Sequence, residues 1–239
     1  MKKIAVVIPA YNESENIVGL CKEILTHYAN ADILIVDDSP DKLTVNAIEH
    51  FEHPQVRISH RDAKGGRGSA VIFGISQCVS GPYDYFLEID ADFSHPPAQI
   101  PALIKQAAEE KLDLLIASRY LVESKIQNWS LSRRIFSKCA NFLARSLLHV
   151  PVSDYTNGYR LYSKNAVLEI VQSCGKLGSG FISLSEILVS LYYKKYTIGE
   201  APTIFVNRIR GESSLSIKEI WNALIGLMRI YQLKRQLLR

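Results

Sequence analysis

The sequence has few cysteines, and they are not arranged for a shared structural role. The four of them lie far apart and form no C-x-x-C pair. This spacing excludes the usual zinc site and a disulfide framework, so we expect a reducing compartment. The cysteines are Cys21, Cys78, Cys139 and Cys174.

Long hydrophobic runs are also missing. The longest stretch of this kind, 220–228, has nine residues, whereas a helix needs about 20 apolar residues to cross a bilayer. The apolar run at the N-terminus stops at Pro9, which makes it too short for the core of a signal peptide. We therefore expect a water-soluble chain in the cytoplasm.

The chain carries little net charge. Its 28 Lys and Arg residues against 24 Asp and Glu residues leave a charge of +4, which does not indicate nucleic-acid binding. Hydrophobic residues make up 47% of the sequence, enough to form a core and to exclude a disordered chain. The length of 239 residues suits one large domain, with or without an appendage.

Apolar segments with strand character alternate with helical segments in the first half. The first helix is expected after Asn12 or Ser14 as its cap, with Glu13 and Glu15 in its first turn. This alternation predicts an α/β fold with a mostly parallel, doubly wound sheet and helices on both faces. Strands are expected at 4–8, 33–36, 56–59, 85–89 and 114–117, and further helices at 65–78 and near 97–110.

The second half is expected to be richer in helix. A polar loop at 153–158 separates the predicted helices. Helices are expected at 131–148, 164–173 and around 185–193, and a strand near 201–206.

The segment 216–239 predicts an amphipathic basic helix. Ser216 and Glu219 form a capping box at its start. From residue 205 onward there are seven basic against two acidic residues, a surplus of five positive charges. Two interpretations stay open: the helix contacts an anionic membrane surface, or its apolar face packs on the domain or in a dimer. The apolar residues on that face are Ile217, Ile220, Trp221, Leu224, Met228 and Tyr231.

Acidic residues follow three of the predicted strands. Glu13 comes after the first strand, Asp38 after the second, and Asp90-Ala91-Asp92 after the fourth. Carboxyl ends of parallel strands meet at the edge of the sheet where ligands bind, and carboxylates gathered there need a cation or hydrogen-bond donors between them. The Asp-x-Asp sequence therefore predicts a hard divalent cation that also holds a diphosphate, whereas Glu13 is equally well explained as an acid at a helix start.

The glycine-rich segment 64–70 is the other candidate for binding phosphate. A dinucleotide fingerprint would follow the first strand, whereas this segment follows the third, so we exclude an NAD site. Either Lys64 and Arg67 contact a phosphate at the start of a helix, or the glycines form an ordinary turn between a loop and a helix. Several arginines after residue 118 could also converge on an anion, and His95 is the histidine nearest the Asp pair.

Together these segments resemble family 2 glycosyltransferases of the GT-A fold, and more narrowly the dolichol- or polyprenol-phosphate mannosyltransferases. The resemblance implies a GT-A (nucleotide-diphospho-sugar transferase) domain at 1–215, with a donor-binding half at 1–118 and an acceptor-binding half at 119–215, followed by the helix at 216–239. The matching segments are 7–13, 36–41, 64–70, 90–96, 118–120, 129–141, 153–160 and 196–200.

The resemblance also implies roles for particular residues. Asp90 and Asp92 would hold Mg²⁺ or Mn²⁺ on the donor diphosphate, and Arg119 and Arg133 would act with them in catalysis. Arg119, Arg133 and Arg208 would bind the acceptor phosphate. The donor would be bound by Pro9, Tyr11, Glu13, Asp38, Lys64, Asp90, Ala91 and Asp92.

The chain departs from the family pattern at four places. The loop after Asp38 is one residue short, which affects the choice of nucleotide base. Phe93 removes a side-chain contact to the metal, and Ser214 stands where a lysine commonly binds phosphate. Asn157 replaces a small residue in the acceptor loop, a milder change.

The implied function is inverting transfer of mannose from GDP-mannose to a polyprenyl or dolichyl phosphate. The enzyme would lie at the cytoplasmic face of a membrane, as a peripheral protein held by its C-terminal helix, and would not bind nucleic acid. One alternative is the same fold with another donor or acceptor, such as UDP-glucose. Another is a non-catalytic protein that binds a sugar nucleotide and acts as the partner of a membrane subunit. The chain could also pair with a second copy of itself as a homodimer.

Overall fold

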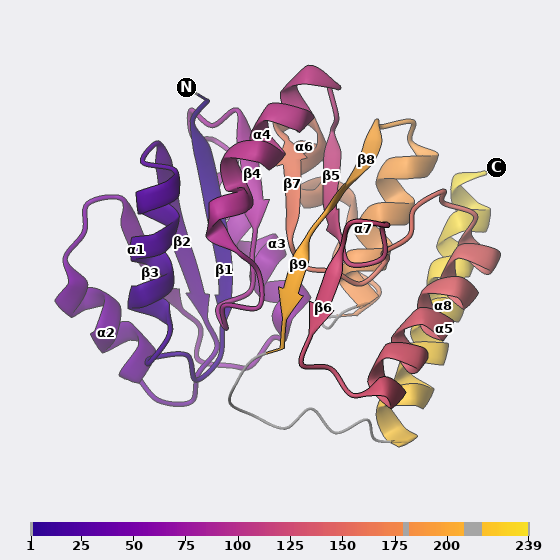
Figure 1. Cartoon of the computed structure of the whole chain (residues 1–239), viewed down its shortest axis with the longest axis horizontal. Coiled ribbons are helices and arrows are strands. Elements are labelled where there is room, and N and C mark those ends of the chain that lie inside the picture. Colours follow the sequence, from indigo (N-terminus) through magenta and orange to yellow (C-terminus); the bar gives the residue numbers. More distant parts are fainter. Residues whose placement is uncertain (1, 179–181, 208–216, 239) are drawn as a thin grey trace.

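Apolar, largely β-branched segments form a seven-stranded sheet in the order β3-β2-β1-β4-β7-β5-β8 (Figure 1). The structure is a computed structural model that describes residues 2–178, 182–207 and 217–238. Neighbouring strands are parallel except around β7, which runs antiparallel to β4 and β5. The strands are β1 (Ile4–Ala10), β2 (Ala31–Asp37), β3 (Val56–His60), β4 (Tyr85–Glu88), β5 (Leu114–Ser118), β7 (Arg160–Ser163) and β8 (Ile198–Pro202).

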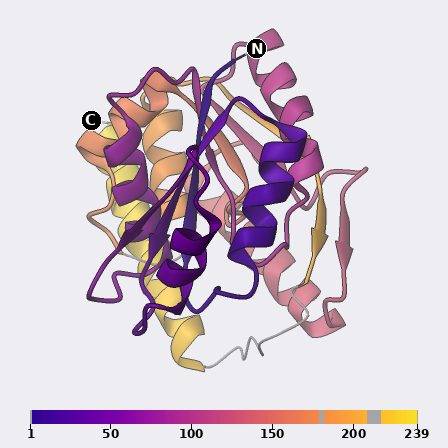
Figure 2. The same ribbon diagram turned by 90° about the vertical axis from the view of Figure 1, so that its left-hand side faces the viewer.

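Helices cover both faces of this sheet, as predicted (Figure 2). One face packs on α1 (Ile17–His27), α2 (Leu43–Phe51) and α4 (Ile100–Glu109), which follows the short 3₁₀ turn η1 (Pro97–Gln99). The other face packs on α3 (Arg67–Cys78), α6 (Lys164–Ser173) and α7 (Ile182–Tyr193). Two long helices, α5 (Leu131–Leu148) and α8 (Ile217–Leu237), complete this second layer beside α7.

The predicted strand at 201–206 is wrong in one respect, because it belongs to two sheets. Its first part continues β8, and its last part is β9 (Ile204–Val206), which pairs in parallel with β6 (Lys125–Gln127). The break lies at Thr203, whose N–H donates to the Ser118 carbonyl at the end of β5. Its hydroxyl donates to Gln99 Oε1 at 2.8 Å. These bonds turn the chain out of the main sheet.

The sequence did not predict β7. This strand has four residues and begins with Arg160, whose side chain is fully buried. Three carbonyl groups accept its guanidinium N–H bonds, those of Asn157 (2.8 Å), Leu184 (2.7 Å) and Tyr155 (2.9 Å). A buried cation at the start of a short strand gives none of the apolar periodicity on which strand prediction depends.

The start of the first helix also differs from the prediction. Helix α1 begins at Ile17 after Asn16, so neither Asn12 nor Ser14 is its cap, and Glu13 lies before its first turn. Asn12 has a positive φ of 60°, which turns the chain before the helix. The Glu13 carbonyl then accepts the N–H groups of Asn16 and Ile17.

Helix α8 packs on the domain over the part whose side chains are described, 225–238. Ile230 and Lys234 are buried, whereas Met228 is 56% exposed and so lies off the packed face. Lys234 Nζ donates to the Leu147 carbonyl at 2.9 Å and contacts His149, at the C-terminal end of α5, where a cation is favourable. Ser216 and the apolar side chains 217–224 lie outside the described residues.

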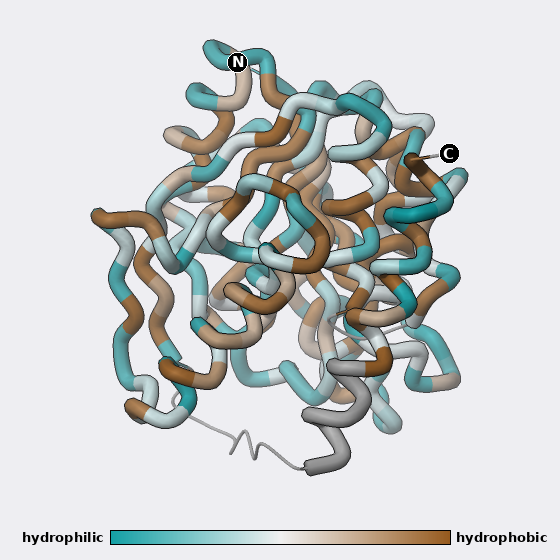
Figure 3. The backbone as a smooth tube through the Cα atoms, turned by 90° about the vertical axis from the view of Figure 1, so that its right-hand side faces the viewer, coloured by the Kyte–Doolittle hydropathy of each residue, from teal (hydrophilic) through white to brown (hydrophobic). Residues whose placement is uncertain are grey.

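No helix within the described ranges is long and apolar enough to cross a membrane. Viewed from the side of α5 and α8, hydrophobic and hydrophilic segments alternate along the helices (Figure 3). A surface helix of a folded domain has this pattern.

Gly74 allows α3 to lie close to β1 and β2, and Gly74→Ala should therefore destabilise the fold. A Cβ atom there would lie 2.5 Å from Val7 Cγ1 and 3.0 Å from Val36 Cγ2. We expect the free energy of unfolding, measured by urea denaturation, to fall by about 1–3 kcal/mol despite the better helix propensity of alanine. Val7→Ala should lower the free energy of unfolding less in the Gly74→Ala variant than in the wild type, because it removes the methyl group that the new Cβ atom would meet. Equal stability of Gly74→Ala and the wild type would contradict the close approach.

Candidate active site

The order of the strands in the sheet reverses between β1 and β4. The chain runs outward from β1 to β2 and β3, then returns to β4 on the other side of β1. Ligands of open α/β sheets bind beyond the carboxyl ends of the strands at such a point. Tyr11, Asp38 and Asp90 each follow one of these strand ends, so the structure brings the predicted residues to one edge.

Asp38 holds the glycine-rich loop. Its carboxylate accepts two hydrogen bonds from Arg61, at 2.6 Å from Nε to Oδ1 and 2.6 Å from Nη2 to Oδ2. The N–H groups of Gly65 (3.0 Å) and Gly66 (3.2 Å) donate to the same Oδ2. The carboxylate predicted to line the nucleotide pocket is thus paired with Arg61, which the sequence analysis missed because a lone arginine before a loop carries no signal.

Tyr11 and Lys64 form an open surface beside Asp38. Tyr11 is 41% exposed, and the Lys64 ammonium lies 3.6 Å from the centroid of its ring. An aromatic face with a cation beside it can stack a nucleotide base and attract its phosphates. Pro9 is half-buried at the end of β1, and Glu13 Oε2 accepts a hydrogen bond from Asn16 Nδ2 at 2.8 Å.

Arg67 joins the two acids at the end of β4. Its Nη1 donates to Glu88 Oε1 at 2.5 Å, and its Nε donates to Asp90 Oδ1 at 2.8 Å. Burial alone would lower the pKa of Arg67, but the Asp90 and Glu88 carboxylates raise it, and Arg67 in turn lowers the pKa of Asp90 against the effect of burial. In the glycine-rich segment, helix α3 thus begins at Arg67, whose side chain binds carboxylates within the protein.

Gly158 connects the loop 153–160 to this cluster. Its carbonyl accepts a hydrogen bond from Arg67 Nη2 at 3.2 Å. A Cβ atom at this position would lie 1.8 Å from the same nitrogen. A side chain at residue 158 would therefore displace the Arg67 guanidinium from its present position.

The Asp90–Asp92 pair fits a divalent cation. Asp92 Oδ1 accepts the N–H of Ser94 at 3.1 Å. Nearby, the buried Ser94 Oγ and both ring nitrogens of His95 have no hydrogen-bond partner among the described residues, and His95 Nε2 lies 3.5 Å from Asp90 Oδ2. No cluster of three or more His, Cys, Asp or Glu side chains suited to a metal is found in the described ranges. A metal here would thus use these two carboxylates together with water and ligand oxygens, as Mg²⁺ often does.

Phe93 does not contribute a polar atom to this site. Its backbone has a positive φ of 58°, and its ring lies against Gly19 of α1.

Arg119 and Arg133 meet on the indole ring of Trp129. Their guanidinium carbons lie 5.4 Å and 4.4 Å from the ring centroid, respectively. The indole Nε1 is buried and has no acceptor among the described residues. Arg133 also donates from Nη1 to Asn207 Oδ1 at 3.1 Å. Two cations and a buried N–H donor in one place can bind an anion.

Aromatic side chains link these arginines to the Asp pair. Phe205 packs edge-on against Trp129 (5.3 Å between centroids) and against His95 (5.2 Å). Contacts through His95, Phe205 and Trp129 thus connect Asp90 with the predicted residues Arg119 and Arg133. Arg208 lies outside the described residues, as does Ser214.

A buried ion pair holds Arg119 in this region. Asp154 accepts from Nε and Nη2 of Arg119, both at 2.8 Å, and from its backbone N–H at 3.0 Å. Burial opposes ionisation of both groups. The charge of Arg119 nevertheless holds the pKa of Asp154 below its ordinary value, and the charge of Asp154 holds the pKa of Arg119 above its ordinary value. The sequence analysis named the loop that contains Asp154 but not this partnership.

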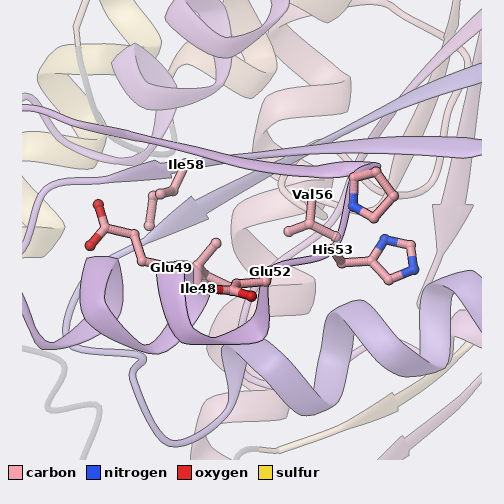
Figure 4. Close-up of a pocket in the computed structure, with 7 residues that line it drawn as sticks. Ile48, Glu49, Glu52, His53, Val56 and Ile58 are labelled. Atoms are coloured by element: carbon pink, nitrogen blue, oxygen red, sulfur yellow. The ribbon is translucent and has the colours of Figure 1, made fainter.

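A separate hollow lies between α2 and β3 (Figure 4). It measures about 310 Å³ and contains none of the predicted site residues. Its lining residues are Ile48, Glu49, Glu52, His53, Pro54, Val56 and Ile58.

Comparison of the sequence with known proteins gives a family match and close relatives. The model of the family described as "Glycosyl transferase family 2" matches residues 5–171. A dolichol-phosphate mannosyltransferase of Pyrococcus furiosus is 36% identical over 233 residues, 95% of this chain and 63% of that protein. An undecaprenyl-phosphate mannosyltransferase of Micrococcus luteus is 32% identical over 234 residues, 95% of this chain and 93% of that protein. The chain thus spans less than two thirds of the archaeal relative.

Solved structures with the same fold include glucosyl-3-phosphoglycerate synthase from Mycobacterium tuberculosis. Its complex with phosphoglyceric acid has a TM-score of 0.70 and 17% identity, covering 97% of this chain and 80% of that one. Its complex with Mn²⁺, UDP and phosphoglyceric acid has a TM-score of 0.69 and 18% identity, covering 96% and 78%. The match confirms the expected GT-A fold.

Removing Asp154 should destabilise the protein strongly. In Asp154→Leu, Arg119 would remain buried without its counter-charge, which lowers the free energy of unfolding by about 3–5 kcal/mol. The double variant Arg119→Met/Asp154→Leu should recover part of this loss, because no buried charge is then left unpaired. Urea denaturation measures all three proteins.

A surface pair provides the control for this prediction. Glu109→Gln, which breaks the exposed Lys105–Glu109 pair, should change the free energy of unfolding by less than about 0.5 kcal/mol. Because the folded-state pKa of Asp154 is lowered, its contribution should be complete above the ordinary Asp pKa of about 4 and disappear at lower pH. A small effect of Asp154→Leu, similar to that of Glu109→Gln, would contradict the role given to the buried pair.

Proposed function

The chain belongs to glycosyl transferase family 2, and from this premise we propose that it transfers mannose from GDP-mannose to a polyprenyl phosphate with inversion. The observation that carries the proposal is the junction of the Asp90–Asp92 pair with Arg119 and Arg133 through His95, Phe205 and Trp129. One part of this region suits a nucleotide diphosphate and the other suits a second phosphate. The names of the two curated relatives supply the mannosyl group and the prenyl phosphate.

The donor would bind at the ends of β1, β2 and β4. Tyr11 and Lys64 offer a face for the base, and Asp38 keeps the glycine-rich loop in place below it. Asp90 and Asp92 would hold Mg²⁺ or Mn²⁺, which would neutralise charge on the departing diphosphate when bound. Arg67 keeps Asp90 ionised and oriented before the donor arrives.

The acceptor phosphate would bind at Trp129 between the arginines. A phosphate monoester is largely ionised near neutral pH, so its oxygen needs orientation more than a general base. Arg133 and the Trp129 N–H can donate to it, and Arg119 is held rigidly by Asp154. Binding here would bring the acceptor phosphate close to the donor diphosphate, and the nearby arginines would screen the repulsion between these two anions.

We also propose that the protein contacts the membrane mainly through α5. Residues 225–238 of α8 pack on the domain, so the apolar face of this part of the helix is not available to contact a membrane. By contrast, α5 exposes Leu131 (73%), Ile135 (55%) and Phe142 (74%) in one stripe. The stripe begins two residues before Arg133, so a lipid acceptor would enter from the surface that the stripe contacts.

Two alternatives make different predictions. A transferase with another donor, such as UDP-glucose, would use the same residues, because no contact of Tyr11, Lys64 or Asp38 distinguishes a base. A non-catalytic partner of a membrane subunit would bind a donor without consuming it. The ionised, oriented Asp90 favours the enzyme over this second alternative.

The first test is formation of a lipid-linked sugar. GDP-mannose and UDP-glucose are each incubated with Mg²⁺ or Mn²⁺ and a polyprenyl phosphate in detergent. We expect product from GDP-mannose, and Asp90→Asn or Asp92→Asn should lower its rate by roughly a thousandfold, as expected for loss of several kcal/mol of stabilisation.

Asp62→Asn is the matched control, since Asp62 is exposed on a neighbouring loop, and it should retain wild-type activity. If product formed with UDP-glucose but not with GDP-mannose, the proposed donor would be wrong and UDP-glucose would take its place. Donor binding with no product from either nucleotide would support the non-catalytic alternative.

The membrane contact is tested by flotation with phospholipid vesicles. Leu131→Ser/Ile135→Ser/Phe142→Ser should reduce the bound fraction by about tenfold or more, because each side chain contributes roughly 1.5–3 kcal/mol on leaving water. The control Leu43→Ser/Leu168→Ser changes exposed residues of α2 and α6 and should float as the wild type does. Unchanged flotation of the α5 variant would remove this helix from the membrane contact.

A further inference from the structure

A groove between α5 and the segment 119–126 lies next to the acceptor arginines. It has a volume of about 460 Å³. The chain between β5 and β6 forms one wall, and the side of α5 that carries Arg134, Lys138 and Arg145 forms the other. Polar groups and apolar side chains such as Phe142 and Ile126 share its lining. We call it the α5 groove.

Three cations of the α5 groove, all on α5, have no carboxylate partner in the described part of the chain. Arg134, Lys138 and Arg145 are spaced by four and seven residues, so they form one row along the helix. All three are exposed, and none makes an ion pair with a carboxylate of the described residues. Arg134 is anchored by a 2.7 Å bond from Nη2 to the Ile126 carbonyl, which keeps its side chain over the groove.

The row of cations runs beside the apolar stripe of α5. Leu131, Ile135 and Phe142 have the same spacing of four and seven residues, displaced by three along the helix. Residues three apart are neighbours on a helix surface, so the two rows lie side by side. Phe142 of the apolar stripe is 74% exposed and also lines the groove, so the stripe and the groove meet at this residue.

We propose that the α5 groove binds the phosphodiester headgroup of an anionic bilayer phospholipid. Arginine and lysine donors would surround the phosphate, while the acyl chains would leave along the apolar stripe into the bilayer. This inference rests on the proposed membrane contact of α5 and adds a specific lipid site to it. A bound headgroup would fix the rotation of α5 on the membrane, and with it the height of Arg133 above the surface.

This site differs from the one for the acceptor phosphate. Asp90, Asp92, Trp129 and Arg133 do not line the α5 groove. Arg119 does, and because its Nε and Nη2 donate to the buried Asp154 it forms a fixed wall between the two sites.

The experiment compares two triple variants of equal charge on vesicles of phosphatidylcholine with and without phosphatidylglycerol. Arg134→Gln/Lys138→Gln/Arg145→Gln removes the groove cations, and Lys22→Gln/Arg57→Gln/Lys105→Gln removes three exposed cations from α1, β3 and α4. The groove variant should bind phosphatidylglycerol vesicles about tenfold or more weakly than the wild type does, because the cations that an anionic surface attracts are gone. The control should change by less than about twofold, since its cations lie away from α5. Thermal unfolding checks that both variants fold.

A further variant and a soluble probe separate a headgroup site from general attraction. Arg134→Lys/Arg145→Lys keeps the charge but not the planar fork, and should bind phosphatidylglycerol vesicles more weakly than the wild type. Glycerophosphoglycerol should compete with the vesicles for the wild type, whereas inorganic phosphate at equal ionic strength should compete less. Equal losses in both triple variants, with no effect of the lysine exchange, would overturn the proposal.

Activity in detergent keeps this inference separate from the proposed function. The groove variant should transfer sugar to a polyprenyl phosphate in detergent at the wild-type rate. A groove variant that loses this activity would show that the groove serves the acceptor, which overturns a separate lipid site. A wild-type protein that binds phosphatidylglycerol through the groove but transfers no sugar would refute the function and leave the lipid site standing.

Discussion

The arrangement of the site depends on Arg67, placed between two carboxylates at the end of one strand. Glu88 is fully buried in β4, and Asp90 follows two residues later. Without a cation between them, one of these groups would have to take up a proton or leave the interior. Arg67 bonds to both and also to the Gly158 carbonyl. Helix α3, the Asp90–Asp92 segment and the loop 153–160 are thereby joined before any ligand binds. Such preorganised charges favour a reaction in which charge develops at the site.

Arg119 and Arg133, the two arginines that we propose for the acceptor phosphate, have different electrostatic surroundings. Arg119 is matched by the buried Asp154, so it can remain in place while the site is empty, and its net attraction for a phosphate is reduced. Arg133 stacks on Trp129, where a planar guanidinium is favourable. The Trp129 N–H is buried without an acceptor in the described part of the chain, and an unpaired donor of this kind is costly unless a ligand satisfies it. An incoming anion would therefore find an unused donor at the Trp129 indole.

Most of the fold follows from sequence periodicity, whereas the partners within the site do not. The apolar runs of β1, β2, β4 and β5 and the spacing of α5 and α6 predicted those elements closely, since burial on one or two faces leaves a regular pattern. The position of Asp90 and Asp92 after a buried strand predicted their place at the ligand edge. By contrast, β7 begins with a buried arginine held by carbonyl groups from distant segments. The pairs Arg61–Asp38 and Arg119–Asp154 each join residues more than twenty positions apart, and charges on surface loops carry no periodicity that would reveal them. Glu88 could have been found, because a charge inside an otherwise apolar strand requires a buried partner.

Helix α8 packs on the domain over residues 225–238, and we assign to α5 the membrane contact that the sequence offered as one interpretation of α8. Amphipathic character alone cannot tell whether an apolar face packs on the protein or on lipid, since both remove it from water. In α8 the buried Ile230 and Lys234 show packing on the domain, and Lys234 donates to the end of α5. Helix α5 is thus fixed at its C-terminal end by α8 and near its N-terminal end by the stacking of Arg133 on Trp129. A helix held at both ends has little freedom to rotate, so Leu131 and Arg133 keep their separate directions. A lipid surface contacted by this helix would therefore lie at a fixed distance and orientation from the site where the acceptor phosphate would react.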